Sequence, residues 1–231
     1  MNKKSNYFLL FISFFLPFSL AAQNEEWGKH HIKFTPTRLI NALYPGLELG
    51  YEYCYGSFSS QFSAAYLINT GIFPNLNSIN GYHIKFEEKY LVGRIKKSKP
   101  PTNSSRKYLS AEINYNYVKL NENRLFLPVE YEQIDWSEQE QYAYKGNFDL
   151  QRKAIVANLK VGVQFKCKKI LLEPCAGIGI GFQNVSHYNK PHPDDILFYP
   201  GPDMDFTSFT DEEGFNILPN FTISFRIGYI F

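Results

Sequence analysis

Two histidines and two aspartates lie close together in the segment "HYNKPHPDD". His187 and His192 lie near Asp194 and Asp195. Imidazole nitrogens and carboxylate oxygens are a ligand set that zinc-like ions accept. Histidines in a proline-containing loop are also common without any metal. Both readings stay open, and we assign no metal and no cofactor.

The same segment begins with a hydroxyl next to an imidazole, Ser186-His187. A serine activated by a histidine is the nucleophile of many acyl-transfer enzymes. Adjacent side chains of a strand point to opposite faces, however, and the sequence offers no third residue to complete the arrangement. We therefore predict that the chain is not an enzyme, with a lipid-modifying activity as the alternative.

Two long segments, 121–151 and 184–216, are rich in acidic residues and are predicted to be loops. The second contains "DMDFTSFTDEEG", whose oxygen-bearing residues alternate as in a calcium loop. Ser208 replaces the central glycine of such a loop, and Gly214 replaces its closing glutamate. These loops could bind an extracellular protein or ligand, or only provide a solvated surface. Residues such as Leu125, Phe126, Val129 and Tyr131 indicate that the strands on either side of the first loop extend above the membrane as a hairpin, whose edge could pair with a partner's strand.

The three cysteines are Cys54, Cys167 and Cys175. An odd number leaves at least one cysteine of an exported chain without an internal partner. No CxxC spacing is present, and Cys167 and Cys175 are out of register in the hairpin expected around 168–169. We predict that all three are packing residues.

The first 22 residues have the three parts of a secretory signal. Lys3 and Lys4 precede an apolar run from Tyr7 to Leu20, and small residues follow. The remaining chain, 23–231, has no apolar stretch long enough for a membrane helix. Its charge is nearly balanced, with 24 Lys+Arg against 22 Asp+Glu, so no overall field favours nucleic acid.

Eight segments of the mature chain alternate between apolar and polar residues. A period of two indicates strands, and most segments have the length that a tilted strand needs to cross a bilayer. Short connections at 56–57 and 168–169 alternate with long ones, as in outer-membrane barrels. The pattern predicts one domain, an all-β, eight-stranded antiparallel up-and-down transmembrane β-barrel. The segments are 30–36, 46–55, 58–68, 81–92, 108–117, 154–165, 170–182 and 220–231.

The polar face of these segments carries acids and bases in similar numbers. Buried ions are costly unless they are paired, so we predict a structural charge network inside the barrel. Glu88 breaks the alternation and predicts a bulge or a position at the membrane interface. The network is expected to contain Lys33, Glu48, Glu52, Lys85, Glu87, Glu112, Lys160, Glu173 and Arg226.

The last segment, "NFTISFRIGYIF", keeps its alternation to the final residue. Ile227, Tyr229 and Phe231 resemble the C-terminal signature that barrel-insertion machinery reads. With the signal peptide and eight strands, the chain resembles small OmpA/OmpX-type outer-membrane proteins of an uncharacterised subfamily. The resemblance implies this architecture and an outer-membrane location in a two-membrane bacterium, with contact to lipid and lipopolysaccharide, and it implies little about function. We hypothesise a non-enzymatic structural or surface-binding role. A lipid A deacylase or acyltransferase activity and a narrow channel are the alternatives.

Overall fold

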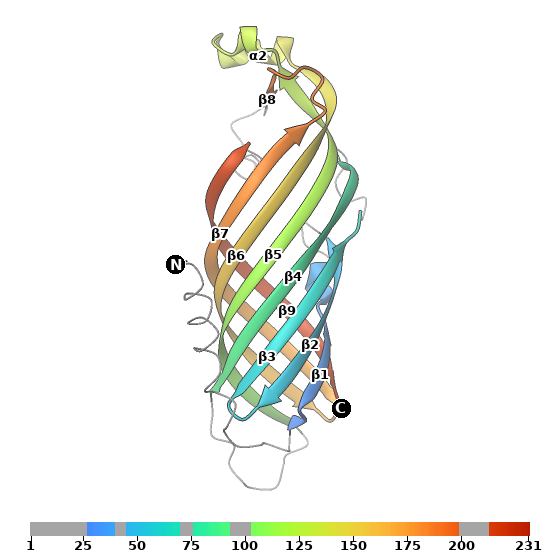
Figure 1. Cartoon of the computed structure of the whole chain (residues 1–231), viewed down its shortest axis with the longest axis vertical. Coiled ribbons are helices and arrows are strands. Elements are labelled where there is room, and N and C mark those ends of the chain that lie inside the picture. The colour runs from blue at the N-terminus through green and yellow to red at the C-terminus, as the bar shows by residue number, and fades with distance from the viewer. Residues whose placement is uncertain (1–26, 40–44, 70–75, 93–102, 199–212) are drawn as a thin grey trace, which may run out of the picture.

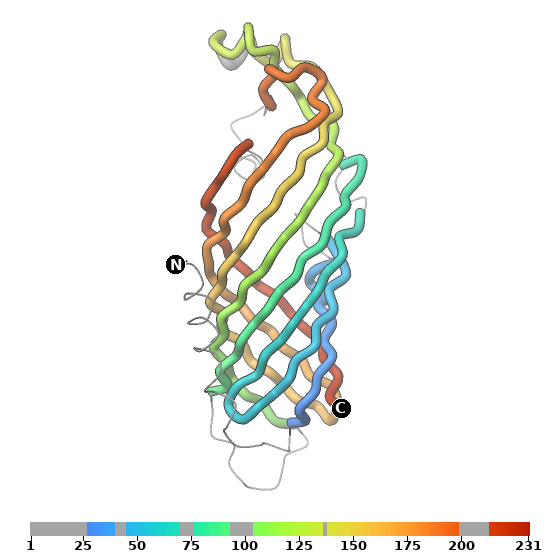
Figure 2. The backbone as a smooth tube through the Cα atoms, viewed as in Figure 1, coloured from blue at the N-terminus to red at the C-terminus, as the bar shows by residue number. Residues whose placement is uncertain are grey.

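The computed structural model describes residues 27–39, 45–69, 76–92, 103–198 and 213–231. The predicted signal peptide, 1–22, lies outside these residues. The described part is an antiparallel β-sheet in which eight strands close into a ring, because β4 pairs with both β3 and β5. Figure 2 shows the path of the backbone around the ring.

The strands follow one another around the ring in the order β4-β3-β2-β1-β9-β7-β6-β5. The last strand pairs with the first, so the ring closes where the chain begins and ends, with Ile32 opposite Tyr229. The predicted all-β, antiparallel, up-and-down arrangement is confirmed. The strands are β1 (His30–Phe34), β2 (Gly46–Tyr55), β3 (Phe58–Leu67), β4 (Leu76–Val92), β5 (Asn103–Leu127), β6 (Tyr144–Cys167), β7 (Ile170–Tyr188) and β9 (Gly214–Ile230).

Two tight turns lie at the end of the ring where the chain terminates, called here the lower end (Figure 1). Gly56 and Ser57 join β2 to β3, and Lys168 and Lys169 join β6 to β7, as predicted. Gly56 has φ +61° and Lys168 φ +57°. Two-residue hairpins need such left-handed residues because their twist then matches that of the strands.

The opposite, upper end carries a long extension of β5 and β6 (Figure 1). Predicted loop 121–151 is wrong in its bounds, because strand pairing continues from Asn121 opposite Asp149 to Phe126 opposite Tyr144. Only 128–143 lies outside the strands, and it contains a short 3₁₀ turn, η4 (Val129–Tyr131), and α2 (Trp136–Tyr142). We call residues 121–151 the hairpin.

Predicted loop 184–216 also contains strand residues. Residues 184–188 complete β7, and 214–216 begin β9. A further short strand, β8 (Ile196–Phe198), pairs with Leu125–Leu127 of β5. The edge of β5 at this height is therefore occupied by the chain itself. Residues 199–212, which include most of the calcium-like segment, lie outside the described part.

The register between β3 and β4 is regular at Glu88, which lies opposite Ser60. The predicted bulge is therefore absent there. The Glu88 carboxylate accepts hydrogen bonds from Tyr55 and Ser60. Another short helix, η3 (Pro36–Arg38), follows β1. None of the described helices is long and apolar enough to cross a membrane.

Candidate functional site

The inner face of the ring holds the charged residues that the alternation assigned to it. All but one of the nine predicted network residues are buried, and Lys85 is half-buried. Arg226 is 2% exposed and Glu173 is fully buried. Buried ions of this kind need partners, and the structure provides them.

Glu173 on β7 is the centre of the network. Its Oε1 lies 2.7 Å from Lys89 Nζ and 2.7 Å from Arg226 Nη1. Its Oε2 contacts Lys33 Nζ and accepts a hydrogen bond of 2.7 Å from Gln164. One carboxylate therefore joins these four side chains, and Tyr108, described below, is a fifth partner.

Arg226 on β9 connects this centre to the other side of the ring. Its Nη1 also lies 2.7 Å from Glu87 Oε2, and its Nη2 lies 3.7 Å from Glu112 Oε2. Lys160 lies 2.5 Å from Glu112 and 3.5 Å from Glu87. The planar guanidinium thus links three carboxylates from three strands through two of its nitrogens.

The remaining members form two smaller groups. Lys85 Nζ lies 2.6 Å from Glu48 Oε2, and Thr35 donates to the other oxygen of Glu48. Glu52 Oε2 lies 2.8 Å from Lys33, and its Oε1 lies 2.9 Å from Lys89. Each of the nine predicted residues is therefore engaged in an ion pair.

The network also contains residues that the sequence analysis did not select. Lys89 lies on the predicted polar face but was not assigned to the network. Tyr108 donates a hydrogen bond of 2.9 Å to Glu173. Its ring lies over Gly162, where a Cβ would come within 2.3 Å of Tyr108 Cζ. The sequence does contain a signal for Tyr108. Its neighbour Leu109 faces outward, so the alternation places Tyr108 on the inner face. The other additions are Gln61, Gln164 and His31.

An apolar cluster lies inside the ring above the charged part. On β5 the inward residues change from Asn116 to Val118 and Leu120. Such a layer offers no partners to a passing ion or polar solute. Its buried members are Leu67, Ile79, Val118, Leu120, Phe126, Phe148, Leu150 and Val185.

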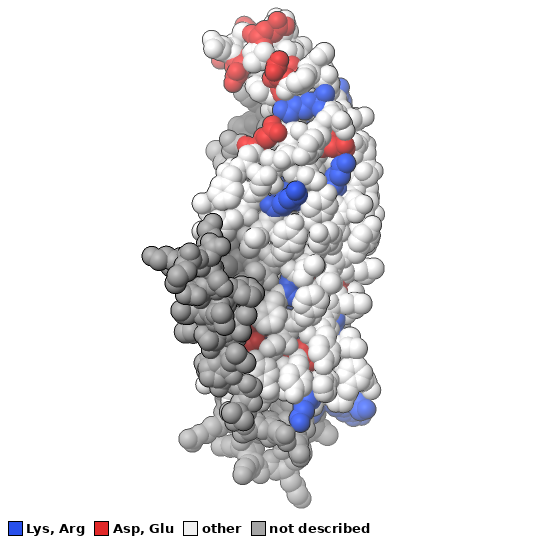
Figure 3. Space-filling model, viewed as in Figure 1, with Lys and Arg blue, Asp and Glu red and all other residues white. Residues whose placement is uncertain are grey.

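The outer face of the ring is apolar and exposed. Ile223 is 86% exposed, Phe221 78% and Leu159 63%. Figure 3 shows charged side chains over the upper extension and near the lower end, with few between them. On β5, the outward residues from Leu109 to Tyr117 are apolar or small, and the exposed Lys107 and Lys119 bound this band.

The band has the height of a bilayer core. The twelve-residue step from Lys107 to Lys119 corresponds to about 40 Å along a strand at about 3.3 Å per residue. A tilt of about 40° reduces it to about 30 Å along the axis of the ring, which is about the thickness of the hydrocarbon core.

Aromatic rings border the band on the outer face. At the lower end, His30, Tyr53, Tyr55, Phe58 and Tyr90 form a row with neighbouring centroids 5.2–6.2 Å apart. Toward the upper end, Tyr82 lies 5.5 Å from Tyr117 and 6.2 Å from Tyr115. Amphipathic rings at two levels are typical of a protein that meets two membrane interfaces.

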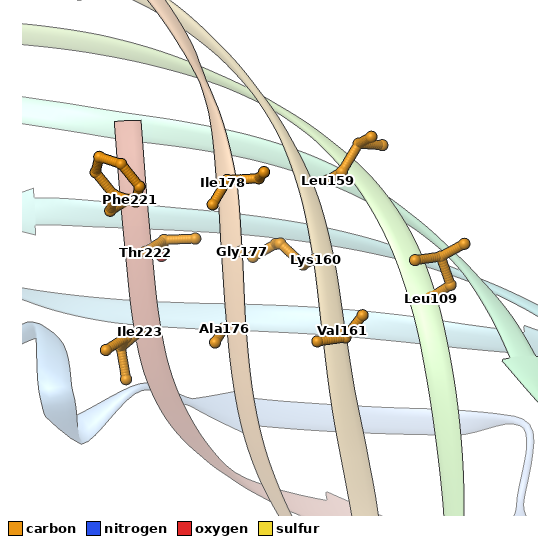
Figure 4. A pocket seen from close by; sticks show the side chains of 10 residues that line it. All are labelled: Leu109, Leu159, Lys160, Val161, Ala176, Gly177, Ile178, Phe221, Thr222 and Ile223. Carbon is orange, nitrogen blue, oxygen red and sulfur yellow. The ribbon is translucent and has the colours of Figure 1, made fainter. Parts of the chain in front are cut away.

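Two hollows lie on this outer face, not inside the ring. One, of about 500 Å³, is lined by side chains of β5, β6, β7 and β9 (Figure 4). The second adjoins it and is lined by small outward residues such as Ala111 and Ala157. They arise because alanine leaves gaps among isoleucine, leucine and phenylalanine. The first is lined by Leu109, Leu159, Lys160, Val161, Ala176, Gly177, Ile178, Phe221, Thr222 and Ile223.

The candidate chemistry around 186–195 does not assemble. His187 packs edge-on against Phe148 and lies 3.8 Å from Glu213, whereas Ser186 follows the opposite face of β7. Asp195 accepts a hydrogen bond from Tyr144. His187, His192, Asp194 and Asp195 are not brought together as a set of ligands for one metal ion. In the described part of the chain, only His31, Glu52 and Cys54 place their ligand atoms close enough together to hold one.

The cysteines differ in their surroundings. Cys175 is buried, and its Sγ lies 2.9 Å from Ser224 Oγ. Cys167 is exposed at a turn, so its predicted packing role is wrong. Cys54 is half-buried, 3.8 Å from His31 Nδ1, and accepts a contact of 3.4 Å from Arg106 Nη2. Cys54 therefore makes polar contacts with two nitrogen-bearing side chains in addition to its packing contacts.

The tip of the hairpin is ordered by its own contacts. The rings of Tyr131 and Tyr142 stack with centroids 4.0 Å apart. The Gln139 amide donates to the carbonyl oxygens of Glu132, at 2.8 Å, and Ile134, at 3.3 Å. The acidic side chains around it belong to Glu130, Glu132, Asp135, Glu138 and Glu140.

Ile227, Tyr229 and Phe231, the predicted insertion signal, all present exposed side chains, at 38%, 42% and 60%. Comparison of the chain with protein-family models, curated protein sequences and solved structures gives no match.

Proposed function

We propose that the chain is a transmembrane β-barrel of a bacterial outer membrane with a non-enzymatic, surface-binding role. The membrane location is supported by the inverted polarity of the ring, which has apolar side chains outside and charged side chains inside. Side chains such as Ile223 are exposed outside, whereas Arg226 and Glu173 are buried inside. In water this arrangement would expose a large apolar surface, and in a bilayer it places that surface in hydrocarbon.

The length of the strands supports a surface role. β5 has 25 residues and β6 has 24, whereas about 9–11 residues suffice to cross a bilayer. The surplus forms the hairpin at the end opposite the tight turns. Barrels of this type keep short turns in the periplasm and long loops outside the cell, so the hairpin would project from the cell surface.

The hairpin is built to be rigid. Phe126 packs edge-on against Phe148 at 5.5 Å, and Leu127 is 1% exposed beneath β8. The tip presents Val129 and Tyr142, which are 51% and 44% exposed, among carboxylates. A preformed apolar and acidic surface binds a partner without the cost of ordering a loop first. We expect an extracellular protein or a cationic ligand as the partner.

The membrane part is tested by fractionation and by electrophoresis of unheated and boiled samples. The chain should sediment with outer-membrane vesicles, and the unheated form should migrate differently from the boiled form in dodecyl sulfate. A chain recovered in the soluble periplasmic fraction without detergent contradicts the proposal.

The surface role is tested by comparing envelope integrity and cell-surface adhesion in cells that lack the chain. A variant in which 128–143 is replaced by a short Asn-Gly turn should restore envelope integrity and fail to restore adhesion. If this variant restores both, the role is purely structural. Loss of both with a normally inserted variant would assign the integrity function to the tip.

A further inference from the structure

His31, Glu52 and Cys54 bring three different metal-ligating atoms together at the lower end of the ring. His31 on β1 pairs with Glu52 on β2, and Cys54 lies two residues further along the same face of β2. His31 Nδ1 lies 2.6 Å from Glu52 Oε2 and 3.8 Å from Cys54 Sγ. All three ligand atoms lie within 4.8 Å of one another.

The orientation of the His31 ring is fixed by Trp27, a residue outside this group. Its Nε2 lies 3.0 Å from the carbonyl oxygen of Trp27, so Nε2 carries a proton and Nδ1 is the atom that faces Glu52 and Cys54. Trp27 is itself 3% exposed and lies beneath the Arg106 guanidinium, 4.3 Å from the ring centroid. Metal-bound histidines usually donate their second nitrogen to a carbonyl or carboxylate in this way.

Glu52 and Cys54 are held by neighbours as well. Glu52 Oε1 accepts hydrogen bonds from Ser59, at 2.9 Å, and Lys89, at 2.9 Å, while Oε2 faces His31 and also lies 2.8 Å from Lys33 Nζ, a contact that a metal on Oε2 would share or replace. Arg106 Nη2 donates to Cys54 Sγ at 3.4 Å. Both side chains are thus held in place by neighbours outside the group.

We propose that His31 Nδ1, Glu52 Oε2 and Cys54 Sγ form a binding site for a thiophilic divalent cation of the zinc class, with one coordination position open. A nitrogen, sulfur and oxygen set suits zinc or cobalt and does not suit calcium or magnesium. Tetrahedral zinc requires about 3.6 Å between nitrogen and sulfur and about 3.4 Å between nitrogen and oxygen. The observed 3.8 Å already fits, and Glu52 Oε2 would move by about 0.8 Å.

Metal binding at this site is coupled to proton release, because a metal takes the lone pair of Nδ1 and the thiolate form of cysteine. Each proton that leaves Nδ1 or Sγ for solvent offsets one positive charge of the entering divalent ion. The charge added next to Lys33, Lys89 and Arg106 is reduced accordingly.

The site is tested with cobalt and zinc on the full chain purified in detergent. A Cys167→Ser/Cys175→Ser variant retains Cys54 as its only thiol. One equivalent of Co²⁺ should give the intense visible absorption of a tetrahedral site together with thiolate-to-cobalt charge transfer in the near ultraviolet. Adding Cys54→Ser should abolish the charge-transfer band, and zinc should displace the cobalt.

A second measurement avoids any variant of the buried His31 and Glu52. In the same single-thiol chain, zinc should slow alkylation of Cys54 by a maleimide at least tenfold, and a chelator should reverse the effect. Matched chains that retain only Cys167 should show no zinc protection. Equal alkylation of Cys54 with and without zinc, or a cobalt band that survives Cys54→Ser, overturns the proposal.

Discussion

Arg226 and Glu173 lie directly opposite each other on β9 and β7, and their side chains meet inside the ring with Nη1 2.7 Å from Oε1. This contact joins the last strand of the chain to the strand that precedes it around the ring. The last strand must also pair with β1 to close the sheet. Arg226 therefore adds a side-chain link inside the ring to the backbone pairing of the strand on which closure depends.

Removing the charge of Arg226 should destabilise the folded chain strongly. Arg226→Met leaves three buried carboxylates with fewer partners, and breaking a buried pair typically costs about 3–5 kcal/mol. Urea unfolding in lipid vesicles measures the effect. Arg226→Met/Glu173→Gln should recover part of the loss, and Lys119→Met should change little, because Lys119 is exposed and 3.7 Å from Asp149. An Arg226→Met chain as stable as the parent contradicts the network.

Adding one methyl group at Gly162 should disturb the same centre from a distance. A Cβ there would lie 2.3 Å from Tyr108 Cζ, so the ring must move and its hydrogen bond to Glu173 is weakened. Overpacking of this kind costs about 1–3 kcal/mol. Gly181→Ala is the matched control, since its Cβ would meet no atom closer than 3.5 Å. The temperature at which the unheated electrophoretic form disappears should fall for Gly162→Ala and stay unchanged for Gly181→Ala.

The sequence predicted the apolar outer band well, and it predicted a hairpin beyond the band but not the bounds of its strands, for one physical reason. Within the band, apolar residues face outward and polar residues face inward, so Leu109 and Glu112 are assigned correctly. In the hairpin this polarity reverses, because the outside is water. Leu120 and Leu150 face inward there, and Asn121 faces the polar exterior. A search for alternation in which the apolar residues always face outward therefore ends each strand at the point where the polarity reverses.

The alternation of polar and apolar residues also explains which network residues could be predicted from the sequence. Alternation placed Glu173 and Arg226 on the inner face, but it does not say which inner residues meet across the ring. Lys89 joins Glu52 and Glu173 from β4, a contact that depends on the curvature of the ring. The group of His31, Glu52 and Cys54 needed one further step, the pairing of the first two strands in register.

Tyr144 reports on the contact that holds β8 against the hairpin, above the apolar band. Partial burial and the hydrogen bond to Asp195 raise the pKa of Tyr144 to about 12. A raised pKa means that the contact is fully present below pH 10, the usual range of the phenol, and is lost as the pH rises through 12. ¹³C NMR of ring-labelled tyrosine, with Tyr144→Phe for assignment, should show this late titration. Asp195→Asn should return the pKa toward 10, and an unshifted Tyr144 in the parent chain contradicts the contact.

The topology of the chain predicts which end a protease reaches on intact cells. A protease site inserted between Glu132 and Gln133 of the hairpin should be cut from outside, because this segment lies beyond the ends of β5 and β6. The same site inserted at Gly56-Ser57 should be protected until the outer membrane is opened. Cutting only at Gly56-Ser57 would reverse the orientation of the barrel.

The central claim is that the outer face of the strands meets hydrocarbon, and nitroxide accessibility along one strand tests it most directly. In a chain with all three cysteines changed to serine, spin labels are placed on the outer face of β5 by Lys107→Cys, Ile113→Cys and Lys119→Cys. In lipid vesicles, collision with oxygen should be greatest at position 113, and collision with a water-soluble nickel chelate should be greatest at 107 and 119. Equal access of the nickel chelate to all three positions would contradict the claim.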